Sequence, residues 1–466
     1  MRALCVAALA ATGRAARGGS RSITGATLFH YRSREAWFGS SAIALQGAAD
    51  PVFMASTWVY KPEEIVGWRP KLNATSAAWA VDTTRDLTYQ TLYVAAPGAA
   101  PIAGVDSLAF WNLKPSGIDG VCVLLGFNSA SGPDVSLGPA APGVRWHVNL
   151  TADCTNINGA VPWSRFALSD DGATAVAWTQ AASGSITVFA FDGQTGAARW
   201  RKDVPCGTPD ACNYFLSYGA DISGDGRWVV FDEGVVGDGP HKLRVLSAAN
   251  GTERCAPVLS PDAQPAHISP DGAFMFSSDD ASAPSTGAFS TWAWNGSAFD
   301  RAGSALPPLA DADGGWTLAQ YAFSQGDSGR VYVGVVWFGA DLAGPSVLAL
   351  YDAAAPGAGA IAWTHTSPLP GVDQANAGAV VDCAGSVCAA GFYTQKAGGP
   401  QATVVAVSAD APGAAWNYTT PGSVDAVSVA RAAGADSYYV LAVGCTSSSV
   451  CTEPGGDLYG FELAVQ

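Results

Sequence analysis

One stretch of the chain has the residue spacing of a calcium-binding loop. In DISGDGRWVVFD, the first, third, fifth and twelfth positions are Asp221, Ser223, Asp225 and Asp232. Oxygen-bearing side chains at these spacings, with glycine in sixth place, surround Ca²⁺ in EF-hand loops. However, the ISxDG letters recur elsewhere in the chain, and WVVF is typical of a strand, so a hairpin turn explains the segment better. We predict no metal site and keep these four residues as the candidate for one.

Other residue types that perform catalysis show no recognised spacing. The sequence has no GxSxG nucleophile elbow, no HExxH or HxH pair and no glycine-rich phosphate loop. Its five histidines are scattered along the chain, at His30, His147, His241, His267 and His365. We therefore predict no catalytic residue, and a protein without catalytic activity is favoured over an enzyme.

Six of the ten cysteines form close pairs in the sequence. Each pair brackets a short loop that contains glycine or serine, and such pairs are easily bridged in an oxidising compartment. The predicted disulfides are Cys206–Cys212, Cys383–Cys388 and Cys445–Cys451. No histidine accompanies them at ligand spacing, so zinc is not predicted. The pairing of Cys122, Cys154 and Cys255 stays open, with Cys255 expected as a buried free thiol.

Asn-x-Ser/Thr sequons also favour the secretory route. They predict N-glycosylation at Asn73, Asn149, Asn250, Asn295 and Asn417. The beginning of the chain, MRALCVAALAATG, combines one arginine, a short apolar run and small residues, as a signal peptide does. Residues 1–22 are therefore predicted to be a signal or targeting segment of a secreted or endomembrane-lumenal protein. An organellar transit peptide is the alternative, because six arginines precede the first acidic residue, Glu35.

The elements that position these residues follow from an internal repeat. The turn motif LSDDG ends at Gly172, ISGDG ends at Gly226 and ISPDG ends at Gly272, with looser copies further on. A short apolar run follows each copy, which predicts strand, tight turn and strand, with glycine providing the positive φ.

A second marker repeats with the same period. Small residues that end in tryptophan close successive units of about 54 residues, and these closing residues are Trp146, Trp200, Trp363 and Trp416. In the earlier part of the chain, only EIVGW at Trp68 resembles such a motif. The period predicts an all-β fold over residues 23–466, a β-propeller of eight four-stranded blades closed by the N-terminal strand. Seven blades are the alternative, if residues 38–146 form a single blade.

The segment AFDGQTGAARW, which ends at Trp200, resembles the tryptophan-docking repeat of the quinoprotein dehydrogenases. The resemblance implies that Asp192, Thr195 and Gly196 shape a turn and that the tryptophan packs against the neighbouring blade. The same role is implied for Trp146, Trp363 and Trp416. The SPDG-like turns also resemble those of WD-repeat and YVTN propellers.

Membership of the quinoprotein family would imply the cofactor pyrroloquinoline quinone (PQQ), with calcium. This chain lacks the adjacent cysteines of the alcohol dehydrogenase type and a CxxCH haem-attachment motif. We predict no cofactor, with Ca²⁺ or PQQ as alternatives.

Charge and hydropathy limit the classes of molecule that the protein is expected to bind. The net charge of −15 argues against binding to nucleic acid or anionic lipid, and no apolar run beyond the targeting segment reaches the ~18 residues that span a bilayer. We expect a soluble recognition module that binds a protein or carbohydrate through its disulfide-bridged loops. The alternatives are a quinoprotein-type oxidoreductase and another propeller enzyme, such as a hydrolase.

Overall fold

The computed structural model consists almost entirely of β-strands, with one 3-10 turn, η4 (Pro356–Ala358), in the part of the chain that it describes. None of the described residues forms a helix long and apolar enough to cross a membrane. The structure describes residues 21–33, 38–45, 51–57, 63–69, 79–83, 87–94, 104–113, 121–130, 132, 143–151, 165–180, 186–204, 220–233, 241–260, 266–278, 286–309, 316–339, 346–366, 379–394, 401–432, 436–445 and 455–466.

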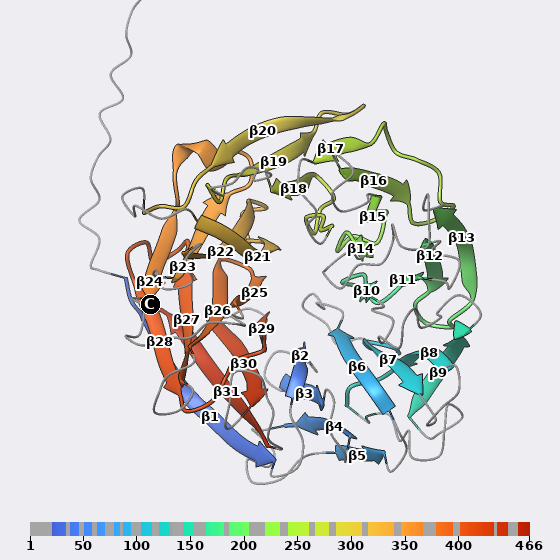
Figure 1. Ribbon diagram of the computed structural model, residues 1–466, viewed down its shortest axis with the longest axis horizontal. Helices are drawn as coiled ribbons and strands as arrows, with labels where there is room; N and C mark the ends of the chain where they lie inside the picture. Colours follow the sequence, from blue (N-terminus) through green and yellow to red (C-terminus); the bar gives the residue numbers. More distant parts are fainter. Residues whose placement is uncertain are drawn as a thin grey trace, which may run out of the picture.

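The strands form eight antiparallel sheets, or blades, arranged in a ring (Figure 1). From the inner to the outer strand, blade 1 contains β2 (Phe38–Leu45), β3 (Pro51–Thr57), β4 (Glu63–Trp68) and β5 (Trp79–Thr83), and blade 2 contains β6 (Leu87–Val94), β7 (Ser107–Leu113), β8 (Val121–Phe127) and β9 (Val144–Asn149). Blade 3 contains β10 (Arg165–Leu168), β11 (Thr174–Gln180), β12 (Ile186–Asp192) and β13 (Ala198–Val204), and blade 4 contains β14 (Ala220–Ile222), β15 (Trp228–Glu233), β16 (His241–Ser247) and β17 (Val258–Ser260).

Blades 5 to 8 continue the ring. Blade 5 contains β18 (Phe274–Ser278), β19 (Phe289–Trp294) and β20 (Phe299–Ala305), and blade 6 contains β21 (Trp316–Gln325), β22 (Val331–Gly339), β23 (Ser346–Asp352) and β24 (Ala362–Thr366). Blade 7 contains β25 (Ala379–Ala384), β26 (Val387–Thr394), β27 (Gln401–Ser408) and β28 (Ala415–Thr420), and blade 8 contains β29 (Ala426–Arg431), β30 (Ser437–Cys445), β31 (Gly456–Val465) and β1 (Ile23–Ser33). In blade 5, a bridge between Ile268 and Met275 places residues 266–268 in the inner position.

The ring is closed by the first strand of the chain. β1 pairs antiparallel with β31, from Ile23 opposite Val465 to Ser33 opposite Gly456, and so supplies the fourth strand of blade 8. This confirms the predicted eight-bladed propeller and its closure by the N-terminal strand. The seven-bladed alternative is wrong, because residues 38–149 form two blades, β2–β5 and β6–β9.

A buried carboxylate fastens this closure. Asp457 of β31 is fully buried, and it accepts hydrogen bonds from Arg32 Nε at 2.9 Å and Nη2 at 3.1 Å. The Nε2 atom of His30 lies 2.8 Å from Asp457 Oδ1, and the His30 ring stacks on that of Tyr459 with 4.3 Å between the ring centroids. Because a two-pronged arginine–carboxylate pair is strong and directional, it pins β1 to the last blade in one register.

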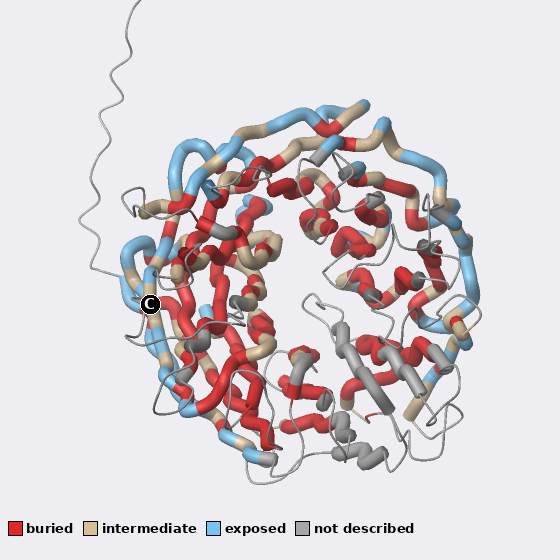
Figure 2. The backbone as a smooth tube through the Cα atoms, viewed as in Figure 1, coloured by how far each residue is buried: buried red, intermediate tan, exposed pale blue. Residues whose placement is uncertain are grey.

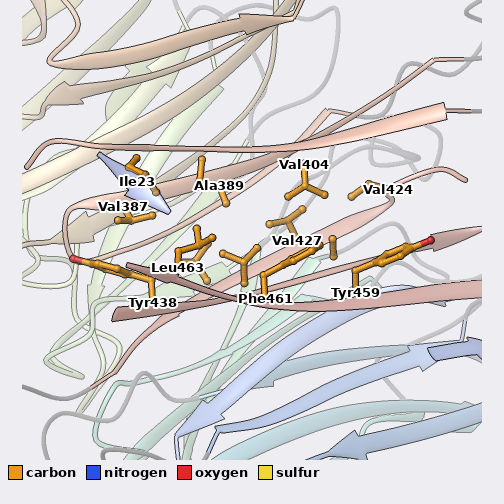
Figure 3. Packing of buried hydrophobic residues seen from close by; sticks show 14 of the residues in the cluster. Ile23, Val387, Ala389, Val404, Val424, Val427, Tyr438, Tyr459, Phe461 and Leu463 are labelled. Atoms are coloured by element: carbon orange, nitrogen blue, oxygen red, sulfur yellow. The ribbon is translucent and has the colours of Figure 1, made fainter. Parts of the chain in front are cut away.

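The hydrophobic core lies between neighbouring blades. In Figure 3, Val404 of blade 7 faces Val427, Phe461 and Leu463 of blade 8, together with Ile23 of the closing strand. Strand residues alternate between the two faces of a sheet, so each blade contributes to the cluster on either side of it. Figure 2 shows that exposure is concentrated along the outer strands, as in β28, where every second residue is exposed.

Three S-x-D-G turns connect the first and second strands of blades 3, 4 and 5. In each turn the serine hydroxyl donates to the aspartate two residues later at 2.6 Å, and the final glycine has φ between 68° and 69°. Neighbouring turns are also joined, because Asp170 N donates to Gly224 O and Asp225 N donates to Pro270 O. The repeated motif therefore shapes each hairpin and links successive blades.

Trp68 does not close a blade, contrary to the sequence-based interpretation. EIVGW forms part of β4, the third strand of blade 1. The Trp68 ring stacks on that of Phe29, with 5.8 Å between the ring centroids, and its centroid lies 4.6 Å from that of Tyr31. Both partners belong to the closing strand β1. Small residues followed by tryptophan suit any strand that packs against a neighbouring blade, so the motif alone does not identify the fourth strand.

Candidate functional site

The innermost strands surround the ring axis (Figure 1), and each has an edge without a partner strand. Backbone N–H groups on such an edge need acceptors. At three junctions, a side chain of one blade accepts a backbone N–H of the next: Asp221 from Ile268 at 3.3 Å, Gln320 from Val381 at 2.8 Å, and Asp382 from Val429 at 2.7 Å. At the junction of blades 8 and 1, the hydroxyls of Ser428 and Ser41 lie 2.8 Å apart.

Asp221 also orients a histidine. Its Oδ1 accepts the backbone N–H of Ile222 at 2.8 Å, and its Oδ2 lies 3.1 Å from His267 Nδ1. This hydrogen bond assigns the proton of the neutral imidazole to Nδ1 and leaves Nε2 as an acceptor. The His267 side chain is 31% exposed, and the edge of its ring meets Tyr321 at 5.1 Å. An aspartate-held imidazole of this kind is able to act as a general base.

Asp170 brings a second carboxyl group close to Asp221. It is the second residue of the turn in blade 3, and its carboxylate lies against Gly224, where a Cβ atom would overlap it. Burial raises the pKa of Asp170 to about 7, helped by repulsion from Asp221, Asp171 and Asp225. The absence of a side chain at position 224 therefore makes room for an acid that takes up a proton near neutral pH.

Asp382 is the third acid of this region. Burial raises the pKa of Asp382 to about 6, against the opposing effects of hydrogen bonds from the Val429 and Cys383 backbone and of His267 when it is protonated. We call Asp170, Asp221, His267 and Asp382 the inner acidic group. Carboxyl groups that titrate near neutrality are concentrated at sites of binding and proton transfer, and this group has the chemistry for either.

Three of the four calcium candidates make hydrogen bonds within the protein, and the fourth, Asp232, is buried. Asp225 Oδ1 accepts from Ser223 at 2.6 Å and from the backbone of Arg227 at 3.0 Å. Asp221 is bonded to His267, and Asp232 is buried in β15. Among the described residues, no three His, Cys, Asp or Glu side chains are arranged to hold a metal ion. Because the chain also lacks adjacent cysteines, we derive no chemical step through calcium or PQQ.

The turn at Asp192 stands between two packed tryptophans. Asp192 Oδ1 accepts from the Thr195 backbone at 3.0 Å and from the Thr195 hydroxyl at 2.9 Å. Gly196, with φ of 71°, lies directly beneath the indole of Trp146 from blade 2. The Trp146 Nε1 atom donates to Gly193 O at 2.8 Å.

The other closing tryptophans differ from one another. Trp200 donates to Ala248 O of blade 4 at 2.9 Å, and Trp416 packs against β1 at Gly25. Trp363 is 38% exposed, and a Cβ placed on Gly413, in the corresponding turn of blade 7, would meet nothing within 4 Å. The structure thus places Trp146, Trp200 and Trp416 against neighbouring blades and leaves Trp363 more open to solvent.

Where the repeat has cysteine in place of tryptophan, an arginine joins the blades. The Arg254 guanidinium lies between the rings of Trp228 at 4.0 Å and Trp294 at 3.8 Å, and it donates to Gly272 O at 2.7 Å. Cys255 is a half-buried free cysteine, and burial raises the pKa of its thiol.

Part of the predicted covalent chemistry is visible. A disulfide joins Cys383 and Cys388 across the β25–β26 hairpin, and Cys445 is also disulfide-bonded. The predicted residues Cys206, Cys212, Cys451, Cys154 and Asn73 lie outside the described residues, as does the side chain of Cys122. The other four sequon asparagines are all exposed, namely Asn149, Asn250, Asn295 and Asn417.

The sequence analysis did not identify Asp170, His267 or Asp382 as candidate functional residues. One signal was available for Asp170: the third position of the turn motif is aspartate in LSDDG but glycine in ISGDG and proline in ISPDG. For His267 and Asp382 we find no such signal, because their proximity depends on the closure of the ring.

Comparison with known proteins supports the architecture. No family model and no curated protein sequence matches the chain. The structure is similar to the Dos1 propeller, with a TM-score of 0.52 at 10% identity over 93% of this chain and 94% of that one. Saccharomyces cerevisiae Sqt1 aligns with a TM-score of 0.47 at 9% identity, over 95% of this chain and 99% of its own. Galerina marginata prolyl oligopeptidase B aligns with a TM-score of 0.46 at 10% identity, over 88% of this chain and 56% of its own. The similarity to the Dos1 propeller supports the β-propeller fold, and the resemblance to quinoproteins and WD-repeat proteins stays a hypothesis.

Proposed function

We propose that this β-propeller is a recognition module without catalytic activity, which binds a protein or carbohydrate on one face of the ring. The observation that carries the proposal is that the turns on one face are bonded to each other, whereas two connections on the other face contain closely spaced cysteines. First-to-second and third-to-fourth strand connections share what we call the turn face. Second-to-third and fourth-to-first connections share the opposite face, which we call the loop face.

On the turn face the side chains are engaged in holding the ring together. The S-x-D-G turns bond to themselves and to each other. In the neighbouring turn, Gln194 Nε2 donates to Val105 O at 2.9 Å and to Gly172 O at 2.7 Å. Groups committed in this way are poorly placed to bind a ligand, because each would first have to give up its present partner.

Two long connections lie on the loop face. Residues 205–219 join β13 to β14, and residues 367–378 join β24 to β25. The first of these contains CGTPDAC, and CTSSSVC begins at the disulfide-bonded Cys445 on the same face. Connections that a disulfide constrains lose less entropy on binding, and this favours a recognition surface. The proposal includes a secreted or endomembrane-lumenal location, where such disulfides persist.

Two matched pairs of substitutions test the choice of face. Cys206→Ser with Cys212→Ser removes the predicted disulfide of the loop face, and Cys383→Ser with Cys388→Ser removes that of the turn face. Each variant is applied to an array of immobilised oligosaccharides and to a panel of purified extracellular-domain proteins. We expect saturable binding that the first pair weakens at least tenfold and the second pair leaves within twofold. Equal loss in both variants, or no saturable binding by the unmodified protein, would refute the proposal.

A hydrolase is the second candidate, and the Asp221–His267 pair is the observation that favours it. With Nδ1 bonded to Asp221, the Nε2 atom of His267 is able to accept a proton from an attacking water or hydroxyl group. His267→Gln should abolish any turnover of chromogenic ester or glycoside substrates, whereas His365→Gln, on the exposed side of β24, should retain it. Turnover that survives His267→Gln would exclude this role.

A further inference from the structure

The described sequons all lie at the outer edge of the ring. Asn149 is the last residue of β9, and Asn417 lies within β28, both of which are fourth strands of their blades. Asn250 and Asn295 lie in the connections between the third and fourth strands of blades 4 and 5. Asn73 falls in the sequence between β4 and β5 and lies outside the described residues.

The local geometry presents these side chains to solvent. On β28, Asn417 and Thr419 are both exposed, and the residues between and before them face blade 8. In blade 4, Asn250 Oδ1 accepts from the Thr252 backbone at 3.1 Å and from its hydroxyl at 2.8 Å. This arrangement holds the amide oxygen toward the sequon threonine and turns the Nδ2 atom, which would carry a sugar, away from it.

Glycosylation also matches a need of the fold. The fourth strand of a blade leaves one row of backbone N–H and C=O groups unpaired, and such edges promote association unless charge or bulk protects them. β13 has no sequon and carries Arg199, Arg201, Lys202 and Asp203, whereas β17 and β28, which follow or contain sequons, carry no charged residue. The other two sequon strands, β9 and β20, combine a sequon with charged residues. β24 has neither protection, and its Trp363 is 38% exposed.

We infer that N-linked glycans at these asparagines form a belt around the outer edge of the propeller and prevent pairing between the outer strands of two molecules. The donor required is a lipid-linked oligosaccharyl diphosphate. A bond forms between asparagine Nδ2 and C1 of the first sugar, the bond from C1 to the phosphate oxygen breaks, and one Nδ2 proton leaves with the diphosphate. The glycans lie outside the ring axis, so the inference does not depend on the ligand proposed above.

The occupancy test uses the full chain expressed in eukaryotic secretory cells. Digestion of the secreted protein with peptide N-glycosidase should increase its gel mobility. The enzyme converts a glycosylated asparagine to aspartate, and mass spectrometry should find aspartate at positions 149, 250, 295 and 417. Partial digestion should give a ladder of bands with one step for each glycan. Thr419→Ala should remove one step, whereas Thr419→Ser, which keeps the sequon, should retain it. Thr252→Ala and Thr252→Ser form a second matched pair. Secreted protein with unmodified asparagines would overturn the inference.

The edge-protection test compares self-association before and after removal of the glycans. Native protein treated with peptide N-glycosidase should sediment faster with rising concentration, and mock-treated protein should not. Asn417→Gln alone should associate more than untreated protein and less than fully deglycosylated protein. If the deglycosylated protein stays monomeric over the same concentrations, the protective role is refuted, even where the asparagines carry glycans.

Discussion

Replacement of Asp170 by asparagine should stabilise the protein above neutral pH and have little effect in acid. In the folded chain, burial and the neighbouring aspartates raise the pKa of Asp170 from 3.8 to about 7. The fold therefore favours the protonated form. The stability associated with this proton is fully present below the unfolded pKa and is lost as the pH rises through the folded value. Asparagine has nearly the same shape but carries no charge at any pH.

The magnitude follows from the size of the shift. At about 1.36 kcal/mol per pKa unit, a shift of this size corresponds to roughly 4 kcal/mol. Partial exposure of Asp170 and relaxation around it reduce the expected gain to about 2 kcal/mol at pH 8. At pH 4 both side chains are largely neutral in the fold, so the two proteins should unfold at nearly the same denaturant concentration.

Urea unfolding of both proteins at pH 4, 6, 7 and 8 measures the difference directly. The control is Asp192→Asn. Partial burial acts to raise the pKa of Asp192, but hydrogen bonds from Thr195 and Arg199 outweigh this effect and lower the pKa. That variant should lose stability at pH 8 and be unaffected well below pH 3. If Asp170→Asn were no more stable than the unmodified protein at pH 8, burial and the neighbouring carboxylates would not raise the pKa of Asp170 in the folded chain.

Three further predictions concern the docking of blades, the closure of the ring and the cofactor. Trp146→Ala should lower the free energy of unfolding by about 3–5 kcal/mol, and Trp363→Ala, at a more exposed position, by much less; equal losses in urea unfolding would contradict this view of blade docking. Asp457→Ala, which removes the hydrogen-bond acceptor of the half-exposed Arg32, should destabilise the fold by about 1–3 kcal/mol and lower the thermal midpoint, and an unchanged midpoint would show that the Arg32–Asp457 pair is dispensable. Calcium, alone or with PQQ, should leave that midpoint unchanged, whereas a ligand at a hundred times its Kd adds about 2.7 kcal/mol, so a clear shift with PQQ would favour the quinoprotein hypothesis.

The sequence by itself determined the features that depend on local geometry. A turn such as ISGDG is specified within five residues, because Ser223 bonds to Asp225 and Gly226 adopts a positive φ. Since blades 3, 4 and 5 repeat this local solution, its period, together with that of the closing tryptophans, reveals both the propeller and the number of blades. The closure by β1 was also predictable, because three strands at the C-terminus lacked a fourth.

Only the tertiary structure decided which distant residues meet. Asp170, Asp221, His267 and Asp382 come from four blades, and no local spacing relates them, so their proximity depends on the curvature of the ring. Packing also decided that Arg254 joins two blades where the repeat has cysteine in place of tryptophan, and that Trp68 belongs to a third strand. Short-range hydrogen bonds specify a blade, whereas burial and electrostatics between blades depend on the closed ring.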